Sequence, residues 1–379
     1  MVIGVGQCGN RIADEFARLG VKSRHERSSN VITGTFAVDS DAPALHGLQI
    51  IDAHRGHRIN IGESRTRGHG AGGLHEVGVQ IAGDDGYKVV DSLRQVRRFA
   101  DTDAFMLVAG AAGGTGSGAV SVLVQAVRER YADRPIYALI VLPFEHEEAL
   151  EPRIAYNTAL CLKAVSSVAD AVFLVDNQRY TTRGHSLAQN IFRTNRLIVD
   201  SFFSLLCAGE ETRRKRIGIS VLDAGDIIQS LVGWSVLGYG KADLPLITLP
   251  WDEVKNRGNQ AMDNALSDLS LQCDTSQSDR ALYLVSAPEK EMNMDLVKHL
   301  GERVRNMAPE ATIRYGDYPV NKGLVDITVI FSALKEVAKI DGYYESFRRN
   351  AESIRKKEAI PPRMMTATGT AASEIPPAE

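Results

Sequence analysis

A glycine-rich stretch at residues 109–120, AGAAGGTGSGAV, has the composition of a phosphate-binding loop. It places five glycines within nine residues, directly after an apolar run at 105–108 and before a segment with helical apolar spacing. A loop at a helix N-terminus offers unpaired N–H groups and the positive end of the helix dipole, and glycine lets phosphate oxygens approach the main chain. Thr115 and Ser117 add two hydroxyl donors. No lysine follows the last glycine, unlike in a Walker loop, so we expect a bound cation to balance the phosphate charge.

A second glycine turn lies near the start of the chain. Gly4, Gly6 and Gly9 satisfy the pattern G-x-G-x-x-G between a short apolar strand pattern at 1–5 and a helical pattern. The pattern is typical of dinucleotide-binding proteins, so a Rossmann-type NAD-dependent oxidoreductase is one alternative. Such an enzyme does not need the second phosphate loop at 110–118.

Two further loops suit a nucleotide site. Asp41 follows a strand pattern at 31–38, and carboxylates at the carboxyl end of a parallel strand face the ligand crevice. A turn or a helix cap is an equally good explanation for Asp41, although Pro43 predicts that no helix follows at once. The stretch 62–73, GESRTRGHGAGG, is rich in glycine and positive charge.

The elements that must position these loops alternate between strand and helix. Apolar runs at 104–108, 136–143 and 171–175 predict strands covered on both faces, as in a parallel sheet, and 87–99 is typical of an amphipathic helix. An apolar helix is predicted at 195–207. Further strands at 217–222, 281–285, 311–315 and 324–331 and a helix at 295–306 follow. The predicted fold class is α/β: a Rossmann-like parallel-sheet domain, a long central helix, and a second, smaller α/β domain with a mixed sheet.

Composition narrows the function. The 379 residues suffice for two domains, and a net charge of −3 gives no basis for nucleic-acid binding. The four cysteines lie far apart, which excludes a C-x-x-C metal or redox pair and suits a reducing compartment. No apolar run has the length of a membrane span. We therefore expect a cytoplasmic protein without a transmembrane segment.

The sequences GQCGN at 6–10 and AGAAGGTGSG at 109–118 resemble the first nucleotide loop and the signature phosphate loop of the tubulin/FtsZ superfamily of GTPases. The resemblance covers about residues 1–335, and within the superfamily the chain most resembles the archaeal tubulin-like CetZ proteins. It implies GTP/GDP and Mg²⁺ as ligands, with Asp41 as an outer ligand of Mg²⁺. The loop at 71–73 resembles the one that senses the γ-phosphate. The nucleotide-binding residues that it implies in the glycine loops are Gly6, Gln7, Cys8, Gly9, Asn10, Arg11, Ala71, Gly72, Gly73, Gly113, Gly114, Thr115, Gly116 and Ser117.

The resemblance also indicates which residues bind the ribose and the base of the nucleotide. In the family a Pro-Phe pair precedes a Glu that binds ribose, with an Arg four residues later. Here Arg153 follows Glu147 by six residues, so Glu147 is the expected ribose ligand and Glu151 the alternative. The side chains of Asn177 and Asn195 are expected to hydrogen-bond the guanine base from two sides, because an amide offers a donor and an acceptor together. The ring is expected to be covered by Ile191 or Phe192.

The stretch VLDAGDI at 221–227 resembles the FtsZ loop N-x-D-F-A-D-V, which completes the active site of the neighbouring subunit. Asp223 and Asp226 match the two acids, whereas Val221 replaces the leading Asn. From its position alone, Asp226 could be only a helix N-cap. The resemblance implies catalysis by this acid pair in a GTPase that polymerises head-to-tail into protofilaments, for cell shape or division. The replaced Asn leaves open a structural protein that binds GTP without hydrolysing it.

The resemblance divides the chain into a GTP-binding domain at 1–194, a central helix at 195–210, a C-terminal domain at 211–335, and a helix with a tail at 336–379. The basic cluster at 212–216 is expected to be a solvated turn. The stretch 361–379 is poor in apolar residues and rich in Pro, Ala and Thr, which predicts disorder. Such a tail could recruit partners.

Overall fold

The computed structural model describes residues 1–52, 56–181, 184, 186–211, 218–243, 251–292, 294–320 and 323–358. The predicted basic turn at 212–216 and the predicted disordered tail at 361–379 lie outside these residues. None of the helices in the described part of the chain combines the length and the hydropathy of a membrane span.

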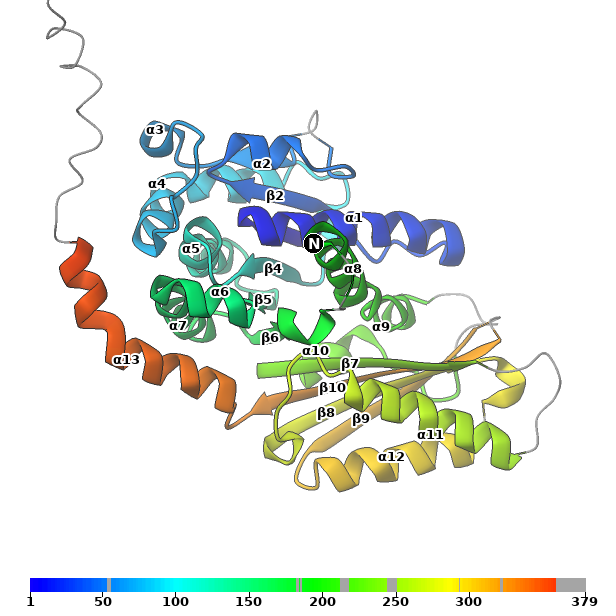
Figure 1. The fold of residues 1–379 in the computed structure, drawn as a ribbon. Helices are drawn as coiled ribbons and strands as arrows, with labels where there is room; N and C mark the ends of the chain where they lie inside the picture. The colour runs from blue at the N-terminus through cyan, green and yellow to red at the C-terminus, as the bar shows by residue number, and fades with distance from the viewer. Residues whose placement is uncertain are drawn as a thin grey trace, which may run out of the picture.

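Six parallel strands form the N-terminal half of the sheet in the order β3-β2-β1-β4-β5-β6 (Figure 1). They are β1 (Val2–Val5), β2 (Thr35–Asp39), β3 (Arg58–Asn60), β4 (Phe105–Gly110), β5 (Ile136–Leu142) and β6 (Ala171–Asp176). Every residue of β1, β2, β5 and β6 is buried. Apolar strands without alternation are buried in this way when helices cover both faces of a parallel sheet, as predicted.

The helices of this half are α1 (Gly6–Arg27), α2 (Ala42–His46), α3 (Glu63–Thr66), α4 (His75–Leu93), α5 (Gly114–Arg130), α6 (Glu145–Leu150), α7 (Pro152–Ser166), α8 (Leu187–Asp200) and α9 (Phe203–Gly209). One apolar core joins α4, α5 and α7 to one face of the sheet. A second joins α1, α8 and α9 to the other face. Short 3-10 helices lie at Phe99–Asp101, Asn177–Tyr180, Thr275–Gln277 and Glu289–Glu291.

The C-terminal half adds a mixed sheet. Its strands are β7 (Gly233–Asp243), β8 (Ser278–Ala287), β9 (Thr312–Pro319) and β10 (Leu324–Leu334), in the order β7-β10-β8-β9. Strand β10 is antiparallel to β7 and β8, and β9 is parallel to β8. Helices α11 (Trp251–Ser267) and α12 (Met294–Met307) lie together below the sheet in Figure 1. A short parallel pairing of residues 171–173 with 233–235 joins the two halves into one ten-stranded sheet.

Two more helices connect the halves. Helix α10 (Ala224–Ser230) follows the described segment 218–223, and α13 (Ala338–Glu358) leaves the second sheet. Helix α13 returns along α7 of the first half (Figure 1), where Phe347 stacks on Tyr156 at a centroid distance of 5.1 Å. The C-terminal helix therefore packs directly against the domain that carries the glycine loops.

Three predicted elements differ from the structure. Helix α4 spans His75–Leu93 instead of the predicted 87–99. Gly78 lies inside it and packs against α5, since a Cβ there would lie 2.2 Å from the Gly114 oxygen. A short helix does follow Asp41, since Pro43 occupies its first turn, where the missing N–H is not needed. Residues 218–222 of the predicted strand at 217–222 are not in a strand, and residue 217 lies outside the described part.

The predicted helix at 195–207 consists of two helices, because the chain turns at residues 201–202 between α8 and α9. Helix α8 begins at Leu187, so Asn195 lies inside it and does not open it. Ser186 accepts from the Gln189 N–H, and the Gln189 side chain accepts from the Ser186 N–H. This S-x-x-Q capping box is a sequence signal for the true start of the helix.

Candidate functional site

A cleft of about 490 Å³ opens at the carboxyl ends of β1, β4, β5 and β6. It gathers segments that are far apart in the sequence, as expected for the crevice of a parallel α/β sheet. Thirteen of the predicted site residues line it: Gly6, Gln7, Cys8, Arg11, Asp41, Gly73, Gly113, Gly114, Thr115, Gly116, Glu147, Asn177 and Asn195.

Two helix N-termini meet in this cleft. Helix α1 begins at Gly6 and α5 begins at Gly114, and neither has a side-chain cap. The first N–H groups of both helices are therefore left for a ligand, and both helix dipoles favour an anion there. The two turns touch, since a Cβ on Gly6 would lie 2.8 Å from the Gly116 nitrogen. The arrangement suits a chain of phosphates.

Two predicted side-chain donors do not face the cleft. Asn10 is 1% exposed, and its amide binds β2: Nδ2 donates to the Asp39 carboxylate at 2.9 Å, and Oδ1 accepts from the Val38 N–H at 3.0 Å. The Ser117 hydroxyl is fully buried and donates to the Gly113 oxygen. Both side chains hold the loops in place, so the expectation that they donate to the nucleotide is corrected.

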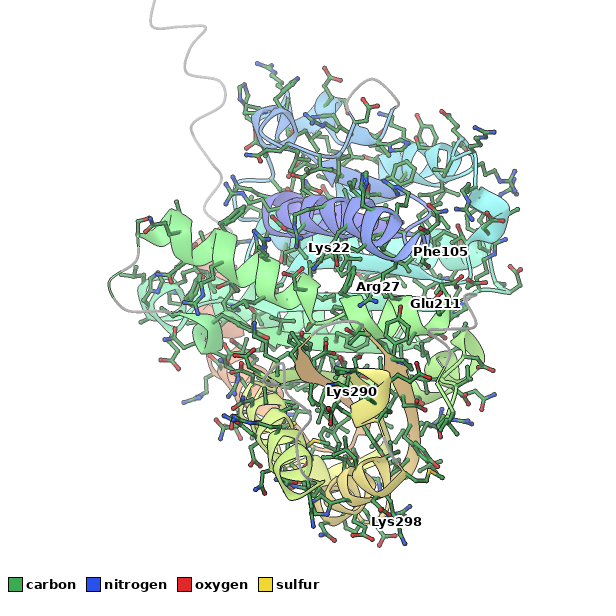
Figure 2. The ribbon with its side chains drawn as sticks, turned by 90° about the vertical axis from the view of Figure 1, so that its right-hand side faces the viewer. Lys22, Arg27, Phe105, Glu211, Lys290 and Lys298 are labelled. Carbon is green, nitrogen blue, oxygen red and sulfur yellow. The ribbon has the colours of Figure 1, made fainter. Side chains whose placement is uncertain are left out.

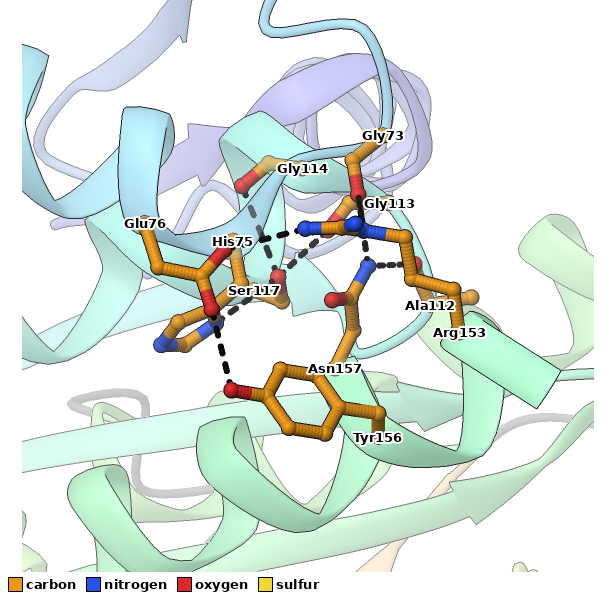
Figure 3. A network of polar contacts seen from close by, with 10 residues as sticks. All are labelled: Gly73, His75, Glu76, Ala112, Gly113, Gly114, Ser117, Arg153, Tyr156 and Asn157. Atoms are coloured by element: carbon orange, nitrogen blue, oxygen red, sulfur yellow. Dashed lines mark hydrogen bonds and ion pairs between the residues drawn. The ribbon is translucent and has the colours of Figure 1, made fainter. Parts of the chain in front are cut away.

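Four other predicted residues are not part of the lining: Gly9, Ala71, Gly72 and Arg153. Gly9 permits close packing of α1, because a Cβ would lie 2.0 Å from the Val108 oxygen. The Arg153 guanidinium donates to the Gly73 oxygen at 3.1 Å and pairs with Glu76 at 3.1 Å. In this structure Arg153 therefore contacts the loop at 71–73 (Figure 3).

Oxygen ligands gather at the phosphate end of the cleft. Asp39 is 2% exposed, and burial raises the pKa of its carboxyl to about 6, against the N–H donors of Asp41, Ser40 and Asn10. The Asp41 carboxylate has no hydrogen bond within the described residues. The Thr115 hydroxyl, 2.6 Å from that of Ser40, belongs to a residue that lines the same cleft. Among the described residues no three His, Cys, Asp or Glu side chains could hold a metal alone. The set fits Mg²⁺, which uses one or two carboxylates together with substrate phosphates and water.

The thiol of Cys8 lines the cleft without acting as a nucleophile. Burial raises the pKa of Cys8 to about 12, against a weaker lowering by Arg11. A thiol with such a pKa is not ionised at neutral pH, and the thiolate is the reactive form. Cys8 is therefore a small, neutral side chain in the lining of the cleft.

The opposite end of the cleft carries the amides. Asn177 follows β6 directly, and Asn195 reaches the lining from the third turn of α8. Ile191 lines the cleft, whereas the neighbouring Phe192 is 55% exposed and does not. Ile191 is thus the better placed of the two residues considered for covering a base.

Both ribose candidates line the cleft. Glu147 accepts from the Phe144 N–H at 2.9 Å, so one of its carboxylate oxygens is engaged at the start of α6. Glu151 lies between α6 and α7, and its carboxylate has no hydrogen bond in the described part of the chain. The segment between Glu147 and Arg153 consists of the end of α6, Glu151 and the first residue of α7.

The buried His75 beside the phosphate loop predicts a pH effect on stability. Its Nδ1 lies 3.1 Å from the Ser117 hydroxyl, and burial lowers the pKa of the imidazole. In the unfolded chain His75 takes up a proton below about pH 6.5, whereas folded His75 does so only at lower pH. We therefore expect the free energy of unfolding to fall as the pH drops below about 6.5, and less steeply for His75→Asn.

Urea unfolding between about pH 7.5 and 5.5 measures this slope. His46→Asn, at an exposed histidine of α2, is the matched control and should keep the slope of the original protein. Identical slopes for His75→Asn and the original chain would contradict the assignment.

Asp223 and Asp226 lie at the amino ends of the strands, opposite the cleft. Helix α10 packs against the start of the sheet, where Ala224, Ile227 and Ile228 line an apolar cavity of about 180 Å³ with Met1 and Phe105. Figure 2 looks onto this side of the molecule, where α1 ends at Arg27 and β4 begins at Phe105. The length of β4 separates the two sites by about 17 Å or more, at about 3.3 Å per residue.

The acid pair has a defined local role. Asp223, not Asp226, is the N-cap of α10: its carboxylate accepts from the Asp226 N–H at 2.7 Å. Asp226 forms an ion pair with Arg314 of β9. Asp223 is exposed and Asp226 is half-buried, so this end of the molecule presents two carboxylates.

Asn157 of α7 lines the cleft and was not predicted. Its Nδ2 donates to the Gly73 oxygen at 2.9 Å and to the Ala112 oxygen at 2.8 Å. No sequence signal points to it, because both partners are main-chain carbonyls of distant loops.

Comparisons with known proteins agree with this geometry. Residues 1–182 match the model of the Tubulin/FtsZ family, GTPase domain, and residues 184–349 match the C-terminal domain of tubulin-like CetZ. The tubulin-like protein CetZ1 of Haloferax volcanii is 28% identical over 341 residues, which are 84% of each chain.

Two solved structures have the same fold. Haloferax volcanii CetZ1, a GDP-bound monomer, has a TM-score of 0.80 at 26% identity over 92% of this chain and 98% of that one. Haloferax volcanii CetZ2, a GTPγS-bound protofilament, has a TM-score of 0.82 at 27% identity over 93% of this chain and 98% of that one. The oxidoreductase alternative is therefore set aside. Since the two matching models together span nearly all of the described residues, the chain belongs to the tubulin/FtsZ family of GTPases and carries a CetZ-type C-terminal domain.

Proposed function

We propose that this chain binds GTP in the cleft and hydrolyses it at the junction between two copies stacked head to tail in a filament. The observation that carries the proposal is that two incomplete sites lie at opposite ends of the strands. One end has uncapped helix N-termini and amides that suit a nucleotide, and the other has the carboxylates Asp223 and Asp226.

The cleft supplies the binding groups. The first N–H groups of α1 and α5 hold the phosphates, since both helices lack a side-chain cap. Asn177 and Asn195 hydrogen-bond the guanine edge, with Ile191 against the ring. Either Glu147 or Glu151 binds the ribose hydroxyls.

A Mg²⁺ ion fits beside the phosphates, where Asp41 and the Thr115 hydroxyl would face it. When bound, the ion neutralises charge on the phosphate oxygens. This replaces the lysine that a Walker loop would supply, which the loop at 109–118 lacks.

Hydrolysis needs a group that orients water and accepts its proton. Two carboxylates line the phosphate end in the described part of the cleft, and neither is left for this role. Three N–H groups already donate to the Asp39 carboxylate, and Asp41 is assigned to the cation. Stacking would bring Asp223 and Asp226 of one copy to the terminal phosphate held by the next. There they could orient a water and take up its proton, which places the chemistry at the junction.

Exposed apolar side chains at both ends support the stacking. Leu150 and Phe192 are 82% and 55% exposed and adjoin residues of the cleft. Ile219 and Val221 are 83% and 54% exposed and precede Asp223. A contact between two different faces does not close on itself and produces a filament, and the similar Haloferax volcanii CetZ2 was solved as a GTPγS-bound protofilament.

A filament of this kind would act in the cytoplasm, in cell shape or division, and the four unpaired cysteines suit that reducing compartment. The tail at 361–379 would be available to recruit partners.

Nucleotide discrimination tests the binding half of the proposal. We expect GTP to bind at least about 100-fold more tightly than ATP, because an amide matched to guanine leaves unpaired groups against adenine. Asn177→Ala should lower this preference by about 10-fold or more. Asn264→Ala, which removes a surface amide bonded to the Lys241 oxygen at 3.0 Å, is the control and should leave the preference unchanged.

Titration calorimetry of the three proteins with each nucleotide measures the preference. Equal binding of GTP and ATP, or binding of NAD, would contradict the proposal. GTP that binds but is never cleaved at any protein concentration would instead support the non-hydrolysing alternative.

A further inference from the structure

Asn157 bonds to two loops beside the cleft, the loop at 70–74 and the phosphate loop at 109–118. Its amide lies between the Gly73 oxygen, at 2.9 Å, and the Ala112 oxygen, at 2.8 Å (Figure 3). Both neighbours are acceptors, so the amide must present its NH₂ to them and its Oδ1 to the other side. Asn157 is 1% exposed, and its Oδ1 has no hydrogen-bond partner among the described residues.

The two loops are packed main chain against main chain. A Cβ on Gly114 would lie 2.6 Å from the Leu74 nitrogen and 2.9 Å from the Gly73 carbon. Gly72 and Gly73 adopt positive φ of 60° and 75°, and a Cβ at either would meet nothing within 4 Å. The loop at 70–74 is therefore anchored on one side, at Gly114 and Asn157, and open on the other.

A second anchor reaches the same carbonyl from the same helix. Arg153 donates to the Gly73 oxygen at 3.1 Å, one turn of α7 before Asn157. Glu76 holds this arginine by an ion pair at 3.1 Å and accepts from the Tyr156 hydroxyl at 3.1 Å. Three residues of α7 thus act on one loop, directly or through Glu76 (Figure 3).

The loop lies where the last phosphate of a bound nucleotide would be. The lining runs from Asn177, after β6, past Gly73 at the N-terminus of α5, to Asp41 and Gly70 on the β2 side. A nucleotide with its base on Asn177 and its first phosphates on the N-termini of α1 and α5 extends toward Gly70 and Gly73. A triphosphate reaches this loop, whereas a diphosphate is one group shorter.

We infer that Asn157 is a positioning residue for the terminal phosphate: by tying the Gly73 carbonyl to the Ala112 carbonyl, it fixes the loop at 70–74 against the phosphate loop and so sets the preference for triphosphate over diphosphate. The inference rests on the proposed function and adds to it a residue that touches neither base nor ribose. Without the amide both carbonyls lose a donor, and the loop is free to move away from the phosphate.

The test compares the affinities of the full chain for GTPγS and GDP in the presence of Mg²⁺. Asn157→Ala should weaken GTPγS binding by about 10-fold to 100-fold and GDP binding by about 3-fold or less. Thr158→Val is the matched control, because Thr158 is the next residue of α7, is fully buried and bonds only the Ile154 oxygen of its own helix. It should change neither affinity.

A purely structural role would not alter the ratio of the two affinities. An unchanged ratio of the GTPγS and GDP affinities in Asn157→Ala would overturn the inference. If Asn157→Ala does not fold, Glu76→Gln removes the charge that holds Arg153 at a side chain that is 45% exposed, and should shift the ratio in the same direction by a smaller factor. An unchanged ratio in Glu76→Gln would then overturn it.

The control outcomes separate this inference from the proposed function. If the unaltered chain binds neither guanine nucleotide, the proposed function fails and the inference fails with it. If the unaltered chain prefers GTPγS and Asn157→Ala keeps the same preference, only the inference fails.

Discussion

An Asp226→Asn protein should bind GTP and assemble, yet turn GTP over about 100-fold to 1,000-fold more slowly than the original chain. The substitution keeps the shape of the side chain and the main-chain N–H that donates to Asp223 at 2.7 Å. It removes the charge that would orient water and accept its proton. Because Asp226 is remote from the cleft of its own subunit, nucleotide affinity should be unaffected.

The matched control for this loss is Asp263→Asn. Asp263 of α11 forms an ion pair with Arg303 of α12, much as Asp226 does with Arg314, and like Asp226 it does not line the nucleotide cleft. Unlike Asp226, it is not one of the two acids assigned to hydrolysis. Partly exposed ion pairs contribute about 0–1 kcal/mol, so both variants should remain folded. Steady-state phosphate release per subunit, measured above the assembly concentration, distinguishes them. Equal turnover in Asp226→Asn and the original chain would remove Asp226 from the catalytic role.

A Gly114→Ala protein should lose both GTP and GDP affinity by about 100-fold or more. The added Cβ would lie 2.6 Å from the Leu74 nitrogen and 2.9 Å from the Gly73 carbon, which are main-chain atoms that cannot rotate away. Either the loop at 70–74 or the start of α5 must shift. Since the α5 N-terminus is a phosphate site, a shift there moves the N–H donors away from the ligand.

Gly83→Ala separates this effect from the general cost of replacing a helical glycine. Gly83 lies inside α4, and a Cβ there meets nothing within 4 Å. Alanine is the better helix former, so this control should gain about 0.5–1 kcal/mol of unfolding free energy and keep nucleotide affinity. Fluorescence titration with labelled GTP and GDP, together with urea unfolding, measures both. Unchanged affinity in Gly114→Ala would show that the α5 N-terminus does not bind phosphate.

Much of the cleft could be predicted because its signals are local. Each glycine loop follows an apolar strand and opens a helix, so the sequence around Gly6 and Gly114 contains both the element order and the ligand chemistry. Asn177 lies directly after β6, but its assignment to the base came from the resemblance to the family. The parallel sheet then brings the ends of these strands to one edge, which determines the site without any knowledge of packing.

Side-chain direction could not be predicted in this way. Asn10 and Ser117 lie in the expected loops, but Asn10 binds Val38 and Asp39, and Ser117 binds Gly113 and His75. Local spacing says nothing of such tertiary partners. Asn157 was missed for the same reason, because the carbonyls that it holds are 84 and 45 residues away in the chain.

Two errors in the helices have different causes. Helix α4 was predicted to start too late because its first turns depend on tertiary contact: Gly78 packs against Gly114 of α5, which local spacing does not reveal. The start of α8 was readable from Ser186 and Gln189, which form a capping box, so that signal was present and overlooked.

The dependence of GTP turnover per subunit on protein concentration is the sharpest test of hydrolysis at the junction between two copies. If each molecule holds the nucleotide at one end and the acids Asp223 and Asp226 at the other, turnover per subunit should be near zero in dilute protein. It should rise steeply once copies begin to stack, and level off when nearly all subunits are assembled. Turnover per subunit that stays constant from dilute to concentrated protein would show that one subunit hydrolyses GTP by itself.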